Sequence, residues 1–288
     1  MKKLILTLNA VILAAIVALD VLLILNRGIV LKSVTSACFV LGGIINAAYA
    51  LKSGAGKKFP VFMLIGLAFA MAGDIAIMKN FIAGAALFAV AHVFYLIAYY
   101  FLCGFHISDI IVSTCIFVPS VLVITLVPAF DFGGVLMEVV CAVYALILSC
   151  MVGKAISNAR TRSAVSIVIA VGSILFFASD LSLLLSNFSS AGNTAGIVCL
   201  ATYYPAQFLL AFAVFGYALQ GMNFFKAAYC RIFQTVLKIA LPLLPYKDPK
   251  IVEKISDIPA VLSANKKKKP LIVTDKTIRA LNLTAGLE

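Results

Sequence analysis

The stretch LILTLNAVILAAIVALDVLLIL, residues 4–25, carries a single ionisable side chain, Asp20. A helix of about 20 apolar residues crosses the hydrocarbon core of a bilayer and satisfies its own backbone hydrogen bonds there. Lys2 and Lys3 before this stretch resemble the start of a signal peptide, but the apolar run is long and lacks a small-residue cleavage site. We therefore expect residues 4–25 to stay in the protein as its first membrane span.

Seven further apolar stretches of similar length follow the first one. Of the 288 residues, 64% are hydrophobic and 12% are charged, and the mean hydropathy is +1.13. Soluble domains are roughly half apolar and a quarter charged, so water cannot be the main solvent of this chain. We predict an all-α membrane protein, a bundle of about eight transmembrane helices. The seven further spans are expected at residues 30–51, 60–78, 81–102, 108–127, 133–153, 163–186 and 194–219.

The basic residues of the loops are distributed unequally between the two sides of the membrane. One side receives Lys2, Lys3, Lys52, Lys57, Lys58, Lys154, Arg160, Arg162 and the basic C-terminal tail, whereas the other receives Arg27, Lys32 and Lys79. Cytoplasmic loops keep the excess of Lys and Arg. We therefore expect an even number of spans with both termini in the cytoplasm, most simply in the cell (plasma) membrane.

The C-terminal region differs in composition from the spans. The formal net charge is +12, and much of the Lys and Arg lies after residue 225. Next to so many spans this charge fits the anionic cytoplasmic leaflet better than nucleic acid, so an anionic lipid surface is the expected partner and nucleic acid is not. We assign residues 1–220 to the transmembrane domain, residues 221–246 to a basic amphipathic interfacial helix, and residues 247–288 to a flexible cytoplasmic tail.

Ionisable side chains inside spans are rare because they are costly in hydrocarbon, so each is a candidate for function. They are Asp20, Asp74, His92, Glu138 and Asp180, with Lys32 at the edge of the second span. With alternating span directions and a rise of 1.5 Å per residue, Asp74 and Asp180 lie about 6 and 9 Å inside the outer boundary. The polar groups therefore converge on the outer half of the bundle, where one inward-facing cavity would collect them.

Each of these residues also has a structural interpretation. Asp20 and Glu138 fit packing contacts between helices, and His92 fits an interhelical hydrogen bond, almost as well as they fit a site. Asp74 and Asp180 are harder to explain in this way, because each follows a small residue and lies in apolar sequence. We take these two aspartates as the main candidates.

A zinc hydrolase and a serine hydrolase are both disfavoured. A multi-histidine zinc centre needs several His ligands. The chain has only His92 and His106, and His106 falls in a loop on the side opposite the aspartates. No G-x-S-x-G motif is present. We expect neither a metal nor another cofactor.

Short motifs occur in a fixed order in four of the predicted spans. They are AGDIAIM at residues 72–78, then Phe81, Gly84, Phe88, His92 and Tyr95, then FASD at residues 177–180, and YYPAQ at residues 203–207. This set closely resembles the YhhN-like lysoplasmalogenase family, and the resemblance covers about residues 4–219. Lys32 stands where family members have a Lys-Pro-Leu stretch, with Ser33 in place of the proline. The resemblance implies a multi-pass membrane enzyme.

The implied reaction is hydrolysis of a vinyl ether. A lysoplasmalogen joins its single chain to glycerol by this bond, and hydrolysis yields a fatty aldehyde and a glycerophospho-base. The chemistry asks for one protonated and one ionised carboxyl, the division of labour used by glycosidases. We therefore expect Asp74 and Asp180 to be the acid and base pair, without deciding which is which. The supporting residues are expected to be Lys32 for the phosphate, with His92, Tyr95, Tyr203, Tyr204 and Gln207 for water, ether oxygen or head group.

Two other classes of protein use buried carboxylates in the same way. A transporter would use them as proton or cation sites, often in inverted repeats with broken helices. The two halves of this chain have no clear repeat, although Gly73 and Pro205 are potential helix breaks. A non-catalytic membrane scaffold would need the aspartates only for stability.

Overall fold

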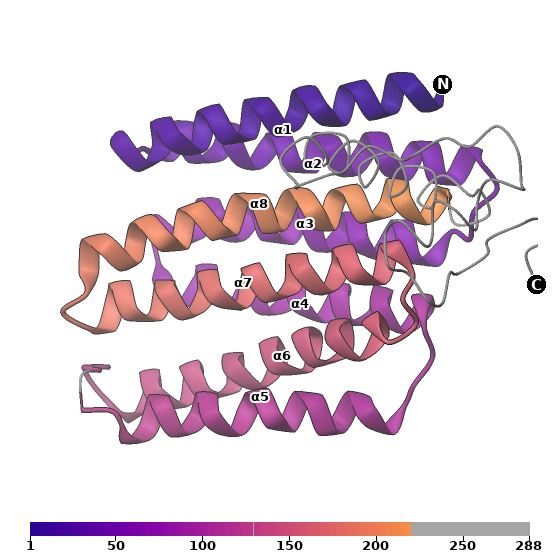
Figure 1. Cartoon of the computed structure of the whole chain (residues 1–288). Helices are drawn as coiled ribbons and strands as arrows, with labels where there is room; N and C mark the ends of the chain where they lie inside the picture. The colour runs from indigo at the N-terminus through magenta and orange to yellow at the C-terminus, as the bar shows by residue number, and fades with distance from the viewer. Residues whose placement is uncertain (129, 220–288) are drawn as a thin grey trace, which may run out of the picture. The chain divides into compact units, whose positions relative to one another are not determined.

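The computed structural model describes residues 1–128 and 130–219, and that part of the chain forms eight α-helices (Figure 1). They are α1 (Lys2–Leu25), α2 (Ile29–Lys52), α3 (Lys58–Ile77), α4 (Phe81–Leu102), α5 (Ile107–Leu126), α6 (Val135–Ala159), α7 (Ala164–Phe188) and α8 (Gly192–Ala218). All eight are long and apolar enough to cross a membrane, which confirms the predicted fold class. The interfacial helix and tail predicted for residues 221–288 lie outside the described residues.

Most predicted span ends agree closely with the helices, but the end of the sixth does not. We expected this span to stop at Gly153 and counted Lys154 among the loop cations, whereas α6 continues to Ala159. The reason is that the Lys154 charge is satisfied inside the bundle. Its Nζ lies 2.8 Å from Oδ2 of Asp109 and donates to the carbonyl of Gly104 at 2.7 Å. The helix therefore passes through this lysine without exposing an unpaired charge.

Consecutive helices run in opposite directions, so the short loops gather at two ends of the bundle (Figure 1). The start of α1, the end of α8 and the loops that follow α2, α4 and α6 lie at one end, which we call the N-terminal end. The loops that follow α1, α3, α5 and α7 lie at the opposite end. Local caps mark some helix starts: the side chains of Asn80 and Ser163 accept hydrogen bonds from the backbone N–H groups of Ala83 and Ser166.

The helices differ in how deeply they are buried. Helix α8 packs against α1, α2, α3 and α7, and much of its surface is buried. Small residues such as Gly42, Gly43 and Ala47 form the buried face of α2 and allow its neighbours to approach closely. Helix α5 lies at the edge, paired with α6, and only Asp109 and Ile124 are buried along its length. The α5–α6 hairpin is therefore the peripheral part of the bundle.

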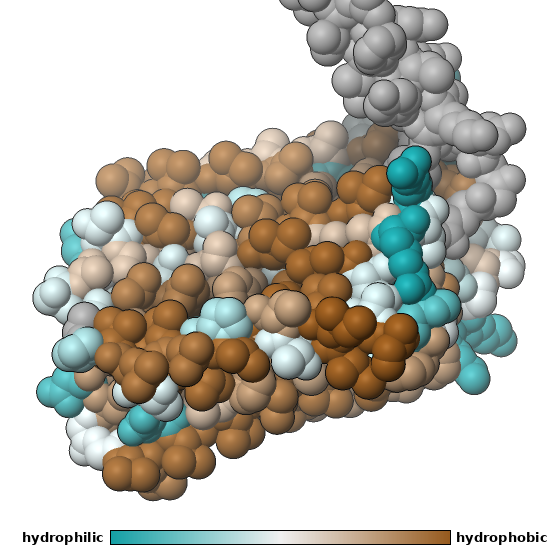
Figure 2. Space-filling view, turned by 60° about the horizontal axis from the view of Figure 1, so that its bottom comes forward, coloured by the Kyte–Doolittle hydropathy of each residue, from teal (hydrophilic) through white to brown (hydrophobic). Residues whose placement is uncertain are grey.

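The side surface of the bundle is apolar. Figure 2 shows one such face, where hydrophobic residues cover the middle and hydrophilic ones collect toward the two ends. Large hydrophobic side chains along the helices, such as Leu122, Val143 and Val171, are exposed. Such an apolar belt matches the hydrocarbon core of a bilayer, so the described chain is an integral, multi-pass membrane protein.

Candidate active site

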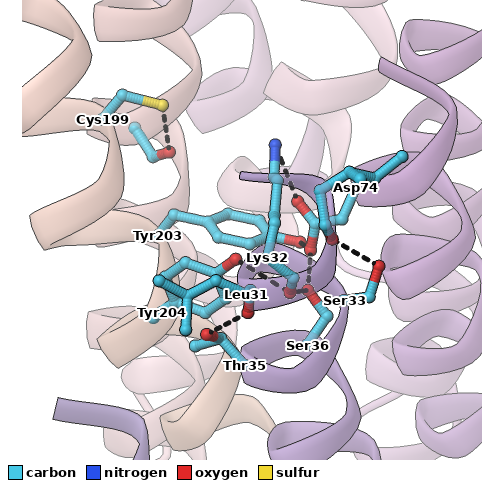
Figure 3. Close-up of polar contacts among 11 residues, drawn as sticks. Leu31, Lys32, Ser33, Thr35, Ser36, Asp74, Cys199, Tyr203 and Tyr204 are labelled. Atoms are coloured by element: carbon cyan, nitrogen blue, oxygen red, sulfur yellow. Dashed lines mark hydrogen bonds and ion pairs between the residues drawn. The ribbon is translucent and has the colours of Figure 1, made fainter. Parts of the chain in front are cut away.

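Asp74, near the end of α3, lies between two neighbouring helices (Figure 3). The hydroxyls of Ser36 in α2 and Tyr203 in α8 donate hydrogen bonds to its Oδ2 atom at 2.6 and 2.7 Å. Nζ of Lys32 lies 3.4 Å from Oδ1 of Asp74, and the Tyr204 hydroxyl donates to the Lys32 carbonyl at 3.5 Å. We call Lys32, Ser36, Asp74 and Tyr203 the lysine cluster. It gives a buried carboxylate both a counter-charge and hydrogen-bond donors.

The sequence builds this cluster with simple local means. Lys32 and Ser36 are four residues apart in α2, so their side chains lie on the same helix face. Gly73 lies directly against the ring of Phe88, and a side chain at this position would have to displace that ring. The glycine therefore lets α3 and α4 pack closely at the level of Asp74. Asp74 is 1% exposed, whereas the Lys32 side chain keeps 14%.

Asp180 belongs to a second polar group, formed by α4, α6 and α7. The Tyr144 hydroxyl donates a hydrogen bond to Oδ2 of Asp180 at 2.7 Å. Nε2 of His92 lies 2.9 Å from the Tyr144 hydroxyl and 3.3 Å from the same Asp180 oxygen. We call His92, Tyr144 and Asp180 the histidine cluster. Because two polar groups that also contact each other meet at one carboxyl oxygen, this arrangement holds the carboxyl group of Asp180 in a fixed orientation.

Aromatic rings fill the space between the two clusters. The Phe176 ring centroid lies 4.7 Å from that of His92 and 5.4 Å from that of Tyr203, and Phe88 contacts Tyr203 at 5.9 Å. The predicted convergence on one half of the bundle therefore takes the form of two polar clusters on either side of an aromatic layer.

A cavity of about 410 Å³ adjoins only the histidine cluster. It lies between helices α4, α5, α6 and α7, and Asp180 and Tyr144 form part of its wall. Asp74 does not line this cavity. We expected one cavity to collect every candidate residue, and among the described residues this cavity does not do so. The physical reason is that Phe88 and Phe176 occupy the space between the two aspartates.

Tyr95 and Gln207 form a separate contact within the same bundle. The Tyr95 hydroxyl donates to Oε1 of Gln207 at 2.9 Å, and both side chains are fully buried. Nε2 of Gln207 and Nδ1 of His92 make no hydrogen bond with any described residue. These two nitrogen atoms are buried polar positions, on predicted supporting residues, that a bound ligand could reach.

The ordered motifs contain both aspartates and several of their neighbours, and the region that holds these motifs matches a known protein family. Residues 28–214, more than half of the chain, match the YhhN family. The chain belongs to the YhhN family. No curated protein and no solved structure matches it. Both polar clusters fall inside the YhhN region, and the family resemblance predicted from the motifs is confirmed.

Two members of the clusters were not singled out from the sequence of this YhhN chain. Ser36 lies one helical turn after Lys32, so the four-residue spacing from the lysine was the available signal. The sequence signal for Tyr144 was weaker, because it is simply a tyrosine within an apolar span. Its role depends on α6 lying next to α7, which no local pattern predicts.

Among the described residues, the remaining acidic side chains share no hydrogen bond or ion pair with either cluster. Asp20 is buried in α1, and its Oδ1 atom makes no hydrogen bond within the described chain. Glu138 lies in the first turn of α6, where a negative charge is favourable. The ion pair of Asp109 with Lys154, which sequence reasoning missed, belongs to the N-terminal end of the bundle. Among the described residues, no three His, Cys, Asp or Glu side chains come together as a metal site.

Proposed function

We propose that this YhhN-family protein hydrolyses the vinyl ether of lysoplasmalogen-type lysolipids, with Asp74 and Asp180 as the acid and base pair. One observation carries the proposal: two aspartates lie in the same half of a membrane-embedded bundle in different surroundings. Asp74 is paired with Lys32 at 3.4 Å, whereas Asp180 borders an apolar cavity. Acid and base catalysis by two carboxyl groups requires such a difference between them.

The separation of the clusters also suits a lysolipid. Its phosphate and its vinyl ether are joined by glycerol, so a binding site needs two polar regions rather than one. Nζ of Lys32 has three hydrogen-bonding protons, and Asp74 needs only one of them, so the others are available to a phosphate oxygen. The apolar chain would then extend on the side of Asp180. Tyr95, Tyr204 and Gln207 would position the head group and the attacking water.

The exposure of Asp180 to the cavity favours it as the proton donor. In the proposed reaction its carboxyl proton is transferred to the carbon beta to the ether oxygen, and the carbon–carbon double bond supplies the electron pair. The resulting oxocarbenium ion takes up water at the alpha carbon. In this assignment Asp74 is the base, and its carboxylate accepts the water proton. The hemiacetal then breaks its bond to the glycerol oxygen, which leaves as an alcohol, while the chain leaves as an aldehyde. One water molecule is consumed.

We also propose that the protein resides in the plasma membrane with both termini in the cytoplasm. The support is the excess of basic residues near the N-terminal end, including Lys52, Lys57, Arg160 and Arg162. In that orientation the lysine cluster lies in the outer half of the membrane. The basic C-terminal region would contact anionic lipid of the cytoplasmic leaflet.

Incubation of the purified full-length protein with a lysoplasmalogen tests the proposed activity. We expect stoichiometric release of fatty aldehyde and glycerophospho-base. The saturated ether lysolipid of the same chain length is the matched control, because it has no double bond to protonate. Release of neither product from several vinyl-ether head groups would refute the proposal and favour the transporter or scaffold interpretation.

A further inference from the structure

The cavity beside the histidine cluster is almost entirely apolar. Phe81, Val123 and Leu184 are typical of its wall, and it borders helices α4 to α7. Its volume of about 410 Å³ lies within the range of small-molecule binding sites. The Ser120 hydroxyl in the wall is already satisfied by the carbonyl of Ile116. The cavity is therefore suited to hydrocarbon over most of its surface.

Its polar spot is formed by Tyr144 and Asp180. The contacts of Asp180 with Tyr144 and His92 both engage its Oδ2 atom, and the Asp180 side chain lines the cavity. A carboxyl group at the wall of an apolar space is costly unless something polar reaches it. The cavity is therefore an apolar space with one polar contact at its wall.

The position of the cavity follows from where polar contacts join α5 to α6. At the N-terminal end, Lys154 pairs with Asp109, and the hydroxyls of Ser108 and Ser157 lie 2.7 Å apart. The cavity residues of α5 and α6 lie farther from the N-terminal end of the bundle, in the half toward its opposite end. The hairpin is therefore fixed by polar contacts at one end and bounds an apolar space in its other half. Because α5 is scarcely buried, this space is separated from lipid by a single peripheral helix.

We propose that this cavity binds the single hydrocarbon chain of a membrane lysolipid, with the oxygen-bearing end of the chain at Tyr144 and Asp180. A molecule with one apolar chain and one polar end matches the single polar spot in the cavity wall. The chain enters from the bilayer past α5, so the ligand never has to cross water. What happens to the bound lipid rests on the proposed function, but the binding site itself does not.

Variants that fill the cavity test this inference in the full-length protein in nanodiscs. The probe is a tritiated hexadecyl-ether lysophosphatidylcholine, which lacks the reactive double bond. Ala145→Phe and Ala85→Phe each place a ring in the cavity from a different helix. We expect each to weaken binding at least about tenfold. Val143→Phe, at a position 54% exposed on the lipid-facing side of α6, is the matched control and should change affinity less than about twofold.

A second measurement uses the unaltered protein, in case a filled cavity prevents folding. The same lysolipid with a diazirine in its chain should form adducts with the cavity-lining segments of α5 and α6. Adducts confined to α1, α2 and α3, or unchanged probe affinity in both folded variants, would overturn the inference.

The two proposals fail in different ways. If Ala145→Phe loses the probe while no vinyl-ether lipid yields aldehyde, the chain site stands and the proposed hydrolysis fails. If aldehyde forms normally and both filled variants bind the probe as the wild type does, hydrolysis stands and the chain site fails. A probe that is displaced equally well by a two-chain phospholipid would overturn the assignment to a single chain.

Discussion

The Tyr144 hydroxyl lies 2.7 Å from Oδ2 of Asp180 and donates a hydrogen bond to it, although the two residues come from different helices. Nε2 of His92 lies 3.3 Å from the same oxygen. Both contacts engage the same oxygen of the carboxyl group, and the Asp180 side chain borders the cavity. Tyr144 therefore controls the direction in which the second oxygen of Asp180 points.

Tyr144→Phe should lower turnover of a vinyl-ether lysolipid by about 10- to 100-fold. Asp180 becomes charged as it gives up its proton, and a hydrogen bond to a charged group is worth about 1.5–3 kcal/mol. The ring remains, so packing against His92 should change little, whereas the affinity for the lipid should fall, because the Tyr144 hydroxyl forms part of the polar contact in the cavity wall. Initial rates of aldehyde release over a range of lipid concentrations separate these effects. Tyr49→Phe is the control, since the Tyr49 ring packs on Phe215 in a different part of the bundle. Equal rates in both variants would remove Tyr144 from the site.

Replacing either aspartate by asparagine keeps its shape but removes the proton-transferring carboxyl. Asp180→Asn and Asp74→Asn should each reduce turnover by at least about 10²-fold, the lower end of what general acid–base catalysis contributes. The folded fraction can be followed with a thiol-reactive dye, because Cys141 is buried in the native protein. Asp131→Asn, in the loop after α5, is the control and should keep full activity. Loss of folded protein instead of rate would support the scaffold interpretation.

The fold was readable from sequence because the bilayer constrains it so strongly. Long apolar runs, such as residues 4–25, permit little other than a spanning helix. The prediction was wrong at α6 because a lysine inside a span is normally a boundary. Lys154 escapes that rule through its contacts with Asp109, which lies 45 positions away in sequence, and with the carbonyl of Gly104. A pairing of that kind depends on which helices are neighbours, and hydropathy carries no such information.

The same limit applies to the candidate site. Sequence identified Asp74 and Asp180 by their rarity in hydrocarbon and placed them correctly in one half of the bundle. It did not separate them, because the rings of Phe88 and Phe176 look like ordinary apolar residues in the chain. The depth of a residue can be counted along a helix, whereas the direction in which it points requires the packing of all eight helices.

The buried pair of Lys154 and Asp109 predicts a stability effect separate from activity. Lys154→Met leaves a buried carboxylate without its counter-charge and should destabilise the protein by about 3–5 kcal/mol. Adding Asp109→Asn to it should recover part of this loss, since no unpaired charge remains. Thermal unfolding in detergent measures both, and Lys79→Met at an exposed position is the control. An unchanged unfolding temperature for Lys154→Met would show that the pair does not hold the hairpin.

The orientation in the membrane can be tested with single cysteines in the loops. Ser53→Cys lies after α2 and Ser190→Cys lies after α7, and both positions are exposed at opposite ends of the bundle. We expect a membrane-impermeant maleimide to label Ser190→Cys in intact cells and Ser53→Cys only after permeabilisation. Cells that express the unaltered protein give the background from native cysteines. The reverse labelling pattern would place both termini outside the cytoplasm.

Turnover in deuterated water tests the proton transfer itself. If a carboxyl group protonates the vinyl ether, that group first exchanges with solvent, so the released aldehyde should carry one deuterium on the carbon next to its carbonyl. The rate should also fall, because proton transfer to carbon is the step expected to limit this chemistry. Mass spectrometry of aldehyde trapped promptly as a hydrazone gives the label. Unlabelled aldehyde incubated in the same buffer for the same time corrects for later exchange. Aldehyde released without deuterium would rule out carbon protonation, and with it the roles of Asp74 and Asp180 as an acid and base pair, even if the protein cleaves lysolipids by another route.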